Sequence, residues 1–296
     1  MFLVLLGLLT LCAVVFFATY VGAGFMFDRE MEKHAQRSEV PLDIVFVVAE
    51  KDAATLPYSV RSVRKWVKHP IRKIVLIGRS GPTLKGVAEE LGLGFIDEDT
   101  LLSLGDFREW LDNEHLALNH SSLTWYYQQF LKLLYHRISD SEYYFVVDAD
   151  IVIKRPMVLV SGDDVHTFFI GENLGHEISK ASIHKLLGES AFVPEFSFIA
   201  DLMCFKKETV ASLIGDIESR FGTDFYKAAI LVEQGNEARF SEYELYGVYA
   251  SGASRDLLVS YAFRPDFARS RGKLWLDQYK LKLKAVPYVA YHHYLN

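Results

Sequence analysis

The sequence predicts an α/β protein with a mixed, mainly parallel sheet flanked by helices, preceded by one N-terminal transmembrane helix. Over the first hundred residues, strand-like and helix-like segments alternate every 25 to 30 residues or so, which is typical of a layered α/β sheet. Hydrophobic residues make up 50% of the 296 positions and charged residues 24%, which excludes a disordered chain. No repeat or Pro/Gly-rich linker divides the body of the chain.

The segment from residue 2 to residue 27 contains no charged side chain. As a helix it would reach about 39 Å, more than the ~30 Å hydrocarbon layer of a bilayer. It is longer than the apolar core of a signal peptide and no Lys or Arg precedes it. We therefore expect a signal anchor rather than a cleaved signal peptide. Arg29, Lys33 and Arg37 follow the segment, so the positive-inside rule predicts a single-pass membrane protein with its body on the cytoplasmic face.

The remaining chain divides into a linker, residues 28–40, and one domain, residues 41–296. With 38 acidic and 32 basic side chains the formal net charge is −6, which argues against nucleic acid as the main partner. The two cysteines, Cys12 in the apolar leader and Cys204 in a hydrophobic run, cannot form a disulfide framework or a cysteine zinc site.

The first elements follow from hydrophobic pattern and stop signals. Leu42–Val48 is a nearly continuous β-branched run, as in a strand buried on both faces. Pro57–Lys68 places apolar and basic residues at helical spacing and ends before His69-Pro70. Lys73–Ile77 predicts a second strand, Leu84–Leu91 a helix ended by Gly92, and Gly94–Ile96 a short third strand.

Beyond a mixed polar region, Thr100–His120, the pattern predicts a strongly amphipathic helix over Ser122–Arg137. That helix leads into a strand, Tyr143–Val147. After Pro156 the alternation weakens. The remaining expected segments are aromatic stretches at 167–170 and 196–205, helices near 208–220 and 242–250, and a terminal stretch at 288–294.

Two carboxylates, Asp148 and Asp150, follow the hydrophobic strand directly. If the backbone stays extended, side chains at i and i+2 point the same way, and two close carboxylates favour a divalent cation such as Mn²⁺ or Mg²⁺. Open α/β sheets bind ligands at the carboxyl ends of their strands. The competing interpretation is a turn or helix cap. A second acidic triplet, Asp97-Glu98-Asp99, follows only a short strand, and we interpret it as a solvated loop.

The segment from Val146 to Pro156 resembles the metal-binding DXD segment of GT-A nucleotide-sugar glycosyltransferases, in which a hydrophobic strand, the DXD and a basic-proline step occur together. Residues 125–133 and 240–247 are similar to segments of an uncharacterised, mostly bacterial, group of DXD-containing glycosyltransferase-like proteins. The resemblance runs from about Leu42 to the C-terminus. It implies a GT-A-like fold, a UDP- or GDP-sugar donor, a glycan or lipid-linked acceptor, and Asp148 and Asp150 joining a metal to the donor.

Further site residues come from the same resemblance. The end of the first strand, Ala49, Glu50 and Lys51, would touch the base and ribose of the donor, or would be an ordinary polar turn. In many GT-A enzymes a histidine near the C-terminus is a third metal ligand, which here means His292 or His293. Adjacent histidines on a strand face opposite ways, so one at most could coordinate. The alternative is a terminal tail without a ligand role.

Three carboxylates are candidate general bases for deprotonating the acceptor. Glu242 and Glu244 open a predicted helix, and Ser241-x-x-Glu244 also has the pattern of a capping box, which would leave Glu242 the freer of the two. Asp201 is a lone acid in an apolar stretch. Because an unpaired charge is costly in such surroundings, we expect its carboxylate to have an interaction partner or a functional role. The sequence does not choose among them.

Polar residues of the helix before the DXD are candidates for binding the donor. Gln128 and Lys132 lie on one face of that helix, while Gln129 is rotated away by one position. The face with Gln128 and Lys132 would either reach the donor or form the solvent-facing side of a core helix. Arg155, just after the DXD, would screen the diphosphate or remain solvated.

Three functions from different classes follow. The first is a metal-dependent glycosyltransferase. The second is a sugar nucleotidyltransferase, but such enzymes cradle the triphosphate in a Gly-rich loop after the first strand, and residues 50–54 contain no glycine. The third is a non-catalytic, membrane-tethered module that binds glycan. A cytoplasmic body suits an enzyme that uses nucleotide sugars in bacteria, and in a eukaryote the same architecture would indicate the Golgi membrane.

Overall fold

The structure is a computed structural model that describes most of the predicted domain. The described residues are 36–118, 120–162, 164–171, 176–189, 191, 193–233, 240–252, 258–263 and 286–291. Within these ranges, no helix has the length and apolar character needed to cross a bilayer. The predicted transmembrane helix, residues 1–27, and the two terminal histidines, His292 and His293, lie outside the described residues.

The described chain contains nine strands and eight α-helices. The strands are β1 Leu42–Val47, β2 Ile71–Gly78, β3 Gly94–Asp97, β4 Tyr143–Val147, β5 Ile151–Ile153, β6 Val165–Ile170, β7 Leu202–Lys206, β8 Leu258–Phe263 and β9 Tyr288–Ala290. The helices are α2 Leu56–Trp66, α3 Pro82–Leu91, α4 Leu104–Asn113, α5 His120–Leu134, α6 His176–Leu187, α7 Lys207–Phe221, α8 Phe225–Val232 and α9 Glu242–Gly252. Short 3₁₀ turns lie at 50–52, 98–100 and 135–137.

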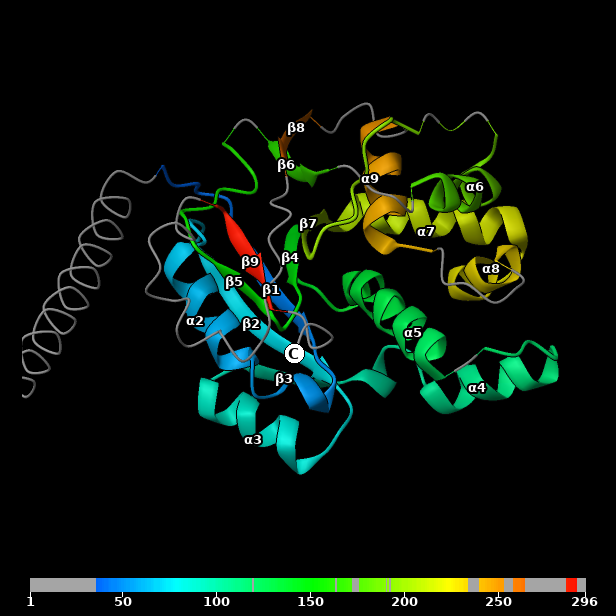
Figure 1. The fold of residues 1–296 in the computed structure, drawn as a ribbon, viewed down its shortest axis with the longest axis horizontal. Coiled ribbons are helices and arrows are strands. Elements are labelled where there is room, and N and C mark those ends of the chain that lie inside the picture. The colour runs from blue at the N-terminus through cyan, green and yellow to red at the C-terminus, as the bar shows by residue number, and fades with distance from the viewer. Residues whose placement is uncertain are drawn as a thin grey trace, which may run out of the picture.

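A five-stranded sheet in the order β3-β2-β1-β4-β7 forms the centre of the molecule (Figure 1). The first four strands are parallel, and β7 pairs antiparallel with β4. β1 pairs with β4 in the register Ile44↔Phe145 and Val45↔Val146. The predicted α/β class with a mixed, mainly parallel sheet is therefore confirmed.

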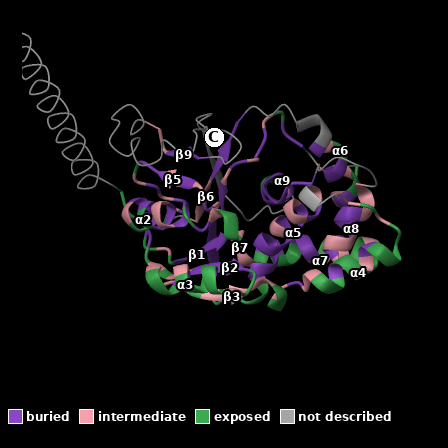
Figure 2. Ribbon diagram, turned by 60° about the horizontal axis from the view of Figure 1, so that its bottom comes forward, coloured by how far each residue is buried: buried purple, intermediate pink, exposed green. Residues whose placement is uncertain are grey.

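Both faces of this sheet are covered by helices. The residues of β1 accordingly alternate between two hydrophobic cores, one on each face. Val45 and Val47 pack into a large core with residues of α5, α7, α8 and α9. Ile44 and Phe46 pack into a second core with residues of α2 and α3. The six residues of β1 are all buried (Figure 2), and all of them except Asp43 are apolar, as in a strand covered on both faces.

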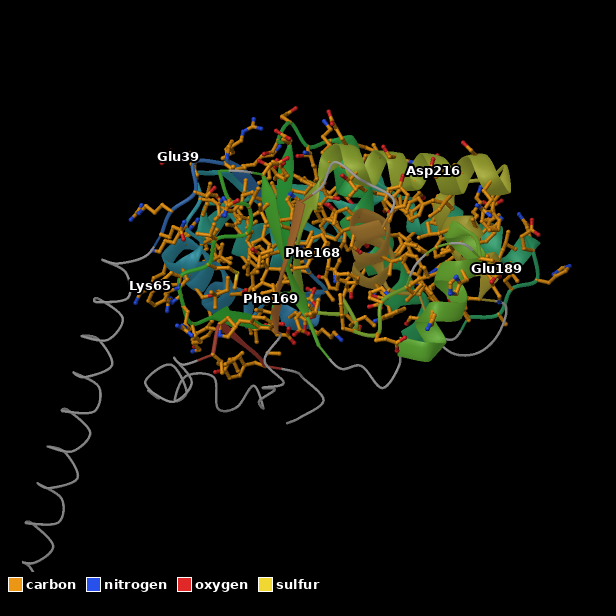
Figure 3. All side chains as sticks on the ribbon, turned by 90° about the horizontal axis from the view of Figure 1, so that it is seen from above. Glu39, Lys65, Phe168, Phe169, Glu189 and Asp216 are labelled. Carbon is orange, nitrogen blue, oxygen red and sulfur yellow. The ribbon has the colours of Figure 1, made fainter. Side chains whose placement is uncertain are left out.

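Two small sheets extend the second half of the chain. β5 pairs antiparallel with β9, and β6 pairs parallel with β8. Neighbouring residues of β6 serve different cores: Phe168 belongs to the α5 side and Phe169 to the α2 side (Figure 3). β6 therefore connects the two layers instead of lying on one of them.

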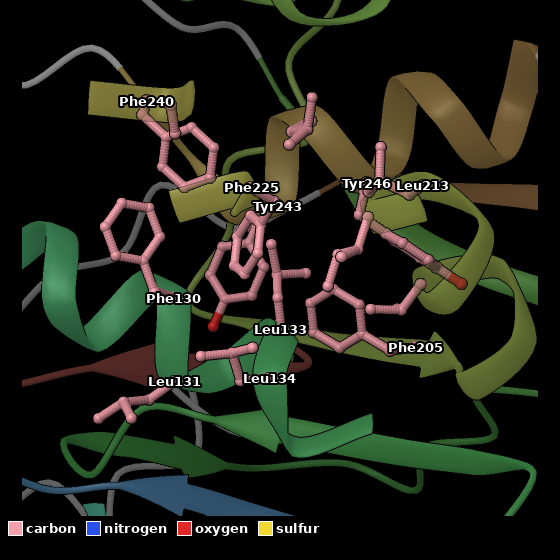
Figure 4. Packing of buried hydrophobic residues seen from close by; sticks show 14 of the residues in the cluster. Phe130, Leu131, Leu133, Leu134, Phe205, Leu213, Phe225, Phe240, Tyr243 and Tyr246 are labelled. Atoms are coloured by element: carbon pink, nitrogen blue, oxygen red, sulfur yellow. The ribbon is translucent and has the colours of Figure 1, made fainter. Parts of the chain in front are cut away.

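The core on the α5 side contains many aromatic rings. Phe130 of α5 lies 5.6 Å from Phe225 and 5.4 Å from Phe240, measured between ring centroids. Tyr243 of α9 stacks on Phe205 of β7 with 6.1 Å between centroids. These rings bring the first turn of α9 against α5 (Figure 4). This contact places the acidic start of α9 beside the sheet.

Candidate functional site

The candidate site lies at the carboxyl edge of the sheet, between β1 and β4. The chain goes from β1 to β2 and β3 on one side, while β4 lies on the other side of β1, so the strand order reverses at this point. In open α/β sheets, such a switch point is where ligands bind. Ala49, Glu50 and Lys51 follow β1, and Asp148 and Asp150 follow β4. Both predicted groups of residues thus meet at one edge.

The acidic pair lies on a turn, which differs from the extended backbone expected there. The Ile151 amide donates to the Asp148 carbonyl (3.1 Å), closing the turn between β4 and β5. The Asp148 amide donates to the Asp201 carbonyl (3.0 Å). The Tyr291 amide donates to the Asp150 carbonyl (2.9 Å). Backbone contacts to two distant segments therefore fix the main chain of both aspartates.

A buried lysine contacts the carboxylate of Asp148. Lys132 Nζ lies 2.9 Å from Asp148 Oδ1 and 2.7 Å from Glu242 Oε1. It also donates to the Tyr243 hydroxyl at 3.1 Å. The side chains of Lys132 and Glu242 are 8% and 1% exposed, whereas that of Asp148 is 35% exposed. The ammonium group therefore joins a fully buried carboxylate to one that faces the edge of the sheet.

Gln129 completes this cluster from one helical turn before Lys132. Its side-chain oxygen accepts a hydrogen bond from the Glu242 amide at 3.2 Å. The sequence predicts that Gln129 is rotated away from the face of Gln128 and Lys132, but positions 129 and 132 are three residues apart and also share a helix face. Tyr243 was not predicted either. The α5–α9 contact could not be read from the sequence, because 110 residues separate Lys132 from Glu242.

Burial and charge act in opposite directions within the cluster. Burial alone would lower the pKa of Lys132, but the carboxylates of Asp148 and Glu242 outweigh it and hold the pKa well above its ordinary value. Burial raises the pKa of the Glu242 carboxyl, and Lys132 offsets only part of that effect. Burial and the nearby Asp148 also raise the pKa of the Tyr243 hydroxyl. Lys132 therefore remains a cation beside Asp148.

Glu244 is held within the protein. Its Oε2 accepts hydrogen bonds from the Ser197 hydroxyl (2.7 Å) and from the amides of Phe198 (2.7 Å) and Ile199 (3.1 Å). The Ser241 hydroxyl accepts from the Glu244 amide at 3.3 Å, which is one half of the capping box suggested by the sequence. Glu244 is fully buried. Its carboxylate fixes the loop 197–199, and Glu242 is no freer, because it is buried against Lys132.

Asp201 lies opposite Asp148. It precedes β7, and its contact with Asp148 extends the antiparallel register Val147↔Leu202 by one residue. Residues paired in this way project from the same face of a sheet. Asp201 is part-exposed, unlike Glu242 and Glu244. Of the three predicted bases, it alone combines exposure with a position beside Asp148.

The remaining predicted donor-binding residues lie nearer the surface. Gln128 is part-buried on α5, and Arg155 is exposed after β5. Glu50 and Lys51 are exposed in the 3₁₀ turn after β1, and Ala49 precedes that turn with an extended backbone. The residues after β1 are thus accessible to a ligand at the carboxyl edge, whereas Lys132 is enclosed.

Two carboxylates on one turn are the donor set of the predicted metal site. A hard cation such as Mg²⁺ often takes only one or two protein carboxylates and completes its shell with water and substrate phosphates, so Asp148 and Asp150 fit this chemistry. Within the described part of the chain, no three His, Cys, Asp or Glu side chains gather closely enough to hold a metal ion alone. His292 and His293, the predicted third ligands, lie outside it.

Residues 94–285 match DUF6492, a family of unknown function, and the chain belongs to that family. No curated protein matches the sequence.

The fold is similar to several solved structures. One is the galactosyltransferase LgtC in complex with donor and acceptor sugar analogs, with 16% identity, a TM-score of 0.44, and coverage of 84% of this chain and 87% of LgtC. Another is mouse xyloside xylosyltransferase 1 in its apo form, with 11% identity, a TM-score of 0.46, and coverage of 87% and 99%. The bifunctional glycosyltransferase WbbM has 14% identity and a TM-score of 0.46, with coverage of 86% of this chain and 46% of that one. Likenesses this distant bear on neither substrate nor mechanism.

Proposed function

We propose that this protein is a metal-dependent glycosyltransferase that moves a sugar from a nucleoside diphosphate, UDP or GDP, to a hydroxyl of a glycan or lipid-linked acceptor. The observation that carries the proposal is the Asp148-Ala149-Asp150 turn at the switch point between β1 and β4. Carboxylates at this place suit a cation-bound pyrophosphate, and the accessible residues after β1 suit the nucleoside.

The two aspartates would hold the Mn²⁺ or Mg²⁺ ion. Such an ion neutralises the charge that develops on a departing diphosphate. Lys132 holds one oxygen of Asp148 at 2.9 Å and so fixes the direction in which that carboxylate presents itself. Because Lys132 is itself held by the buried Glu242, it keeps this position without a ligand. Arg155, exposed after β5, adds positive charge for the diphosphate.

Asp201 is the candidate base for an inverting transfer. The acceptor oxygen would form the new bond to the anomeric carbon as the bond from that carbon to the diphosphate breaks. The nucleoside diphosphate would leave with the bonding electron pair, and the acceptor proton would pass to the Asp201 carboxylate. In a retaining transfer the leaving diphosphate would take that proton. Glu242 and Glu244 are unsuited to the step because both are enclosed in the core.

We also propose that residues 2–27 anchor the protein in a membrane, with the domain on the cytoplasmic side, where nucleotide sugars are made in bacteria. Fusion of a fluorescent reporter and of a periplasm-dependent phosphatase to the C-terminus would report the side. A fluorescent fusion with an inactive phosphatase fits the proposal, and the reverse pattern contradicts it.

The function is tested by incubating the detergent-solubilised full chain with Mn²⁺ and a panel of UDP- and GDP-sugars, and measuring release of the nucleoside diphosphate. We expect release with at least one donor, and about 100-fold slower turnover in Asp201→Asn with donor affinity unchanged. Absence of donor binding in the native chain would favour the glycan-binding module instead. Condensation of a nucleoside triphosphate with a sugar phosphate would identify a nucleotidyltransferase.

A further inference from the structure

The positive charge of this acidic protein is concentrated in one stretch. Between residues 53 and 88 the chain has eight Lys or Arg residues and no Asp or Glu, although its net charge is −6. The stretch contains α2, β2 and the beginning of α3. This stretch of the chain is therefore strongly basic, while the rest of the chain is acidic.

The cations of α2 lie on the face that points away from the sheet. Val60, Val63 and Trp66 are buried against the second core, whereas Arg61 and Arg64 are exposed. Together with the part-exposed Lys65 and with the exposed Arg72 at the start of β2, they form what we call the basic surface, which consists of Arg61, Arg64, Lys65 and Arg72.

The three arginines of the basic surface contact few polar groups within the described part of the chain. Arg64 donates to the Leu91 carbonyl (2.6 Å) and Arg61 lies 5.9 Å from the Tyr58 ring. Within the described residues, no carboxylate forms an ion pair with Arg61, Arg64 or Arg72. The exposed carboxylates on adjoining segments include Glu39, Glu89, Glu90 and Asp140, and Asp140 lies 3.6 Å from Lys73, the residue after Arg72. The arginines are thus available to an external anion.

The chain enters the domain beside the basic surface. The Ser38 amide donates to the Lys68 carbonyl (2.9 Å), just past the end of α2, and His69 Nδ1 hydrogen-bonds the Val40 carbonyl (2.9 Å). Ser38 is only eleven positions after Phe27, the end of the predicted membrane span. Even fully extended, that length reaches about 40 Å. If the span is inserted, the end of α2 therefore lies within about 40 Å of the membrane.

We propose that the basic surface binds the anionic phospholipid headgroups of the membrane in which residues 2–27 are anchored. Each Lys or Arg near an anionic bilayer adds to the attraction, and a tether that already holds the domain there raises the effective concentration. Lys65 and Glu39 lie at one end of the molecule, and Glu189 and Asp216 lie at the other (Figure 3).

Docking by this surface also orients the candidate site. α2 follows β1 and returns toward the amino edge of the sheet, where Arg64 meets the end of α3 and Arg72 begins β2. The aspartate turn lies at the carboxyl edge, one strand length of about 20 Å away. When the basic surface is bound to the membrane, the candidate site at the carboxyl edge therefore faces away from the headgroups. This inference rests on the proposed anchor and is independent of the proposed sugar transfer.

The test uses the full chain in nanodiscs of phosphatidylcholine alone or with 30% phosphatidylglycerol, an approximate physiological content of anionic lipid. Hydrogen exchange of residues 57–73 is compared between the two. We expect slower exchange in the anionic discs, loss of that protection at high salt, and its loss in the triple variant Arg61→Glu, Arg64→Glu, Lys65→Glu.

The matched control reverses three exposed cations elsewhere, Arg108→Glu, Lys185→Glu and Arg220→Glu, and should keep the protection. Nucleotide-sugar binding should be the same in both triple variants. Equal exchange in neutral and anionic discs, or protection that survives reversal of the basic surface, would overturn the proposal. Tighter binding of the same surface to a duplex oligonucleotide than to the anionic discs would overturn it in favour of a nucleic acid partner.

Discussion

Two segments of this protein have the same Asp-x-Asp pattern at the carboxyl end of a parallel strand, but their carboxylates have different surroundings. At the end of β3, Asp97 Oδ1 accepts from the Asp99 amide (3.2 Å) and Asp99 Oδ1 accepts from the Leu104 amide (2.9 Å). At the end of β4, the Asp148 carboxylate forms an ion pair with the ammonium group of Lys132, a residue of α5 (2.9 Å).

The difference separates a structural acid from a candidate ligand. The first segment lies at the edge strand, and its carboxylates satisfy backbone amides within five residues. The second lies at the switch point, and side chains from α5 and α9 support it. A carboxylate that only closes a local turn needs no buried charged groups around it. Buried charged groups beside an exposed carboxylate fix the direction in which it points, as a ligand-binding side chain requires. The surroundings, and not the pattern, distinguish the two.

The largest effect should come from removing the cation behind Asp148. Lys132→Met leaves the buried Glu242 carboxylate without its partner, so we expect a loss of about 3–5 kcal/mol in the free energy of unfolding, measured with urea. In the control, Lys227→Met breaks the more exposed pair with Asp224 (2.8 Å), for which about 1 kcal/mol or less is expected.

Adding Glu242→Gln to Lys132→Met should recover part of the loss, because the two residues form one interacting pair. If Lys132→Met and Lys227→Met lowered the free energy of unfolding equally, the buried cluster would contribute no more to stability than the exposed ion pair does.

Next in size is the contrast between the two acidic segments in turnover. Asp148→Asn should slow sugar transfer by about 100-fold, equivalent to about 2.7 kcal/mol, because a neutral amide is a poor ligand for a divalent cation. Asp99→Asn should leave turnover within about twofold, since the Asp99 carboxylate accepts the Leu104 amide at the edge strand and lies away from the switch point. Turnover is measured as the release of nucleoside diphosphate. A similar loss of turnover in Asp148→Asn and Asp99→Asn would contradict the assignment of a ligand role to the second segment alone.

The structural role of Asp99 predicts a smaller effect on stability. Asp99→Ala removes the acceptor for the first amide of α4 and should lower the free energy of unfolding by about 1 kcal/mol, as for loss of a helix cap. Urea denaturation gives this value directly. An unchanged midpoint would mean that Ser103, which accepts from the Asp106 amide at 3.2 Å, is sufficient to cap the helix.

A further difference between the two segments is a pH dependence of stability at the first one. Burial, with Asp99 beside it, raises the pKa of the Glu98 carboxyl from 4.5 to about 7. Between these two values the folded protein binds more protons at Glu98 than the unfolded chain, so this group makes stability fall as pH rises. Glu98→Gln should therefore stabilise the protein, with a gain that grows from pH 5 to pH 8 in urea titrations. A gain independent of pH would contradict this assignment.

The sequence predicted the four parallel strands of the central sheet because they are mostly apolar. Tyr143–Val147 was predicted with the bounds it has in the structure, and the helices at α2, α3 and α5 were located by period and stop residues. α4 was missed in a polar region, although Ser103 followed by Asp106 is an N-cap signal. α8 was missed because Phe225–Val232 is short and mostly apolar, which leaves no helical period to detect.

The candidate site was only partly predictable. The position of Asp148 and Asp150 at a strand end follows from local pattern, since the strand and its end are local features. The turn at 148–151 and the contact with Asp201 depend on how β7 pairs. The roles of Gln129, Lys132 and Glu242 depend on α9 packing against α5, a contact between helices distant in sequence. Local periodicity contains no information about such contacts.

A thermal-shift titration of the full chain with UDP- and GDP-sugars, with and without Mn²⁺, tests the account most directly. The native chain should be stabilised by one donor only when Mn²⁺ is present, and Asp150→Asn should abolish that stabilisation while unfolding at a similar temperature without ligand. An equal shift in the native chain and in Asp150→Asn, or no shift with any donor, would contradict the assignment of this turn as the donor site.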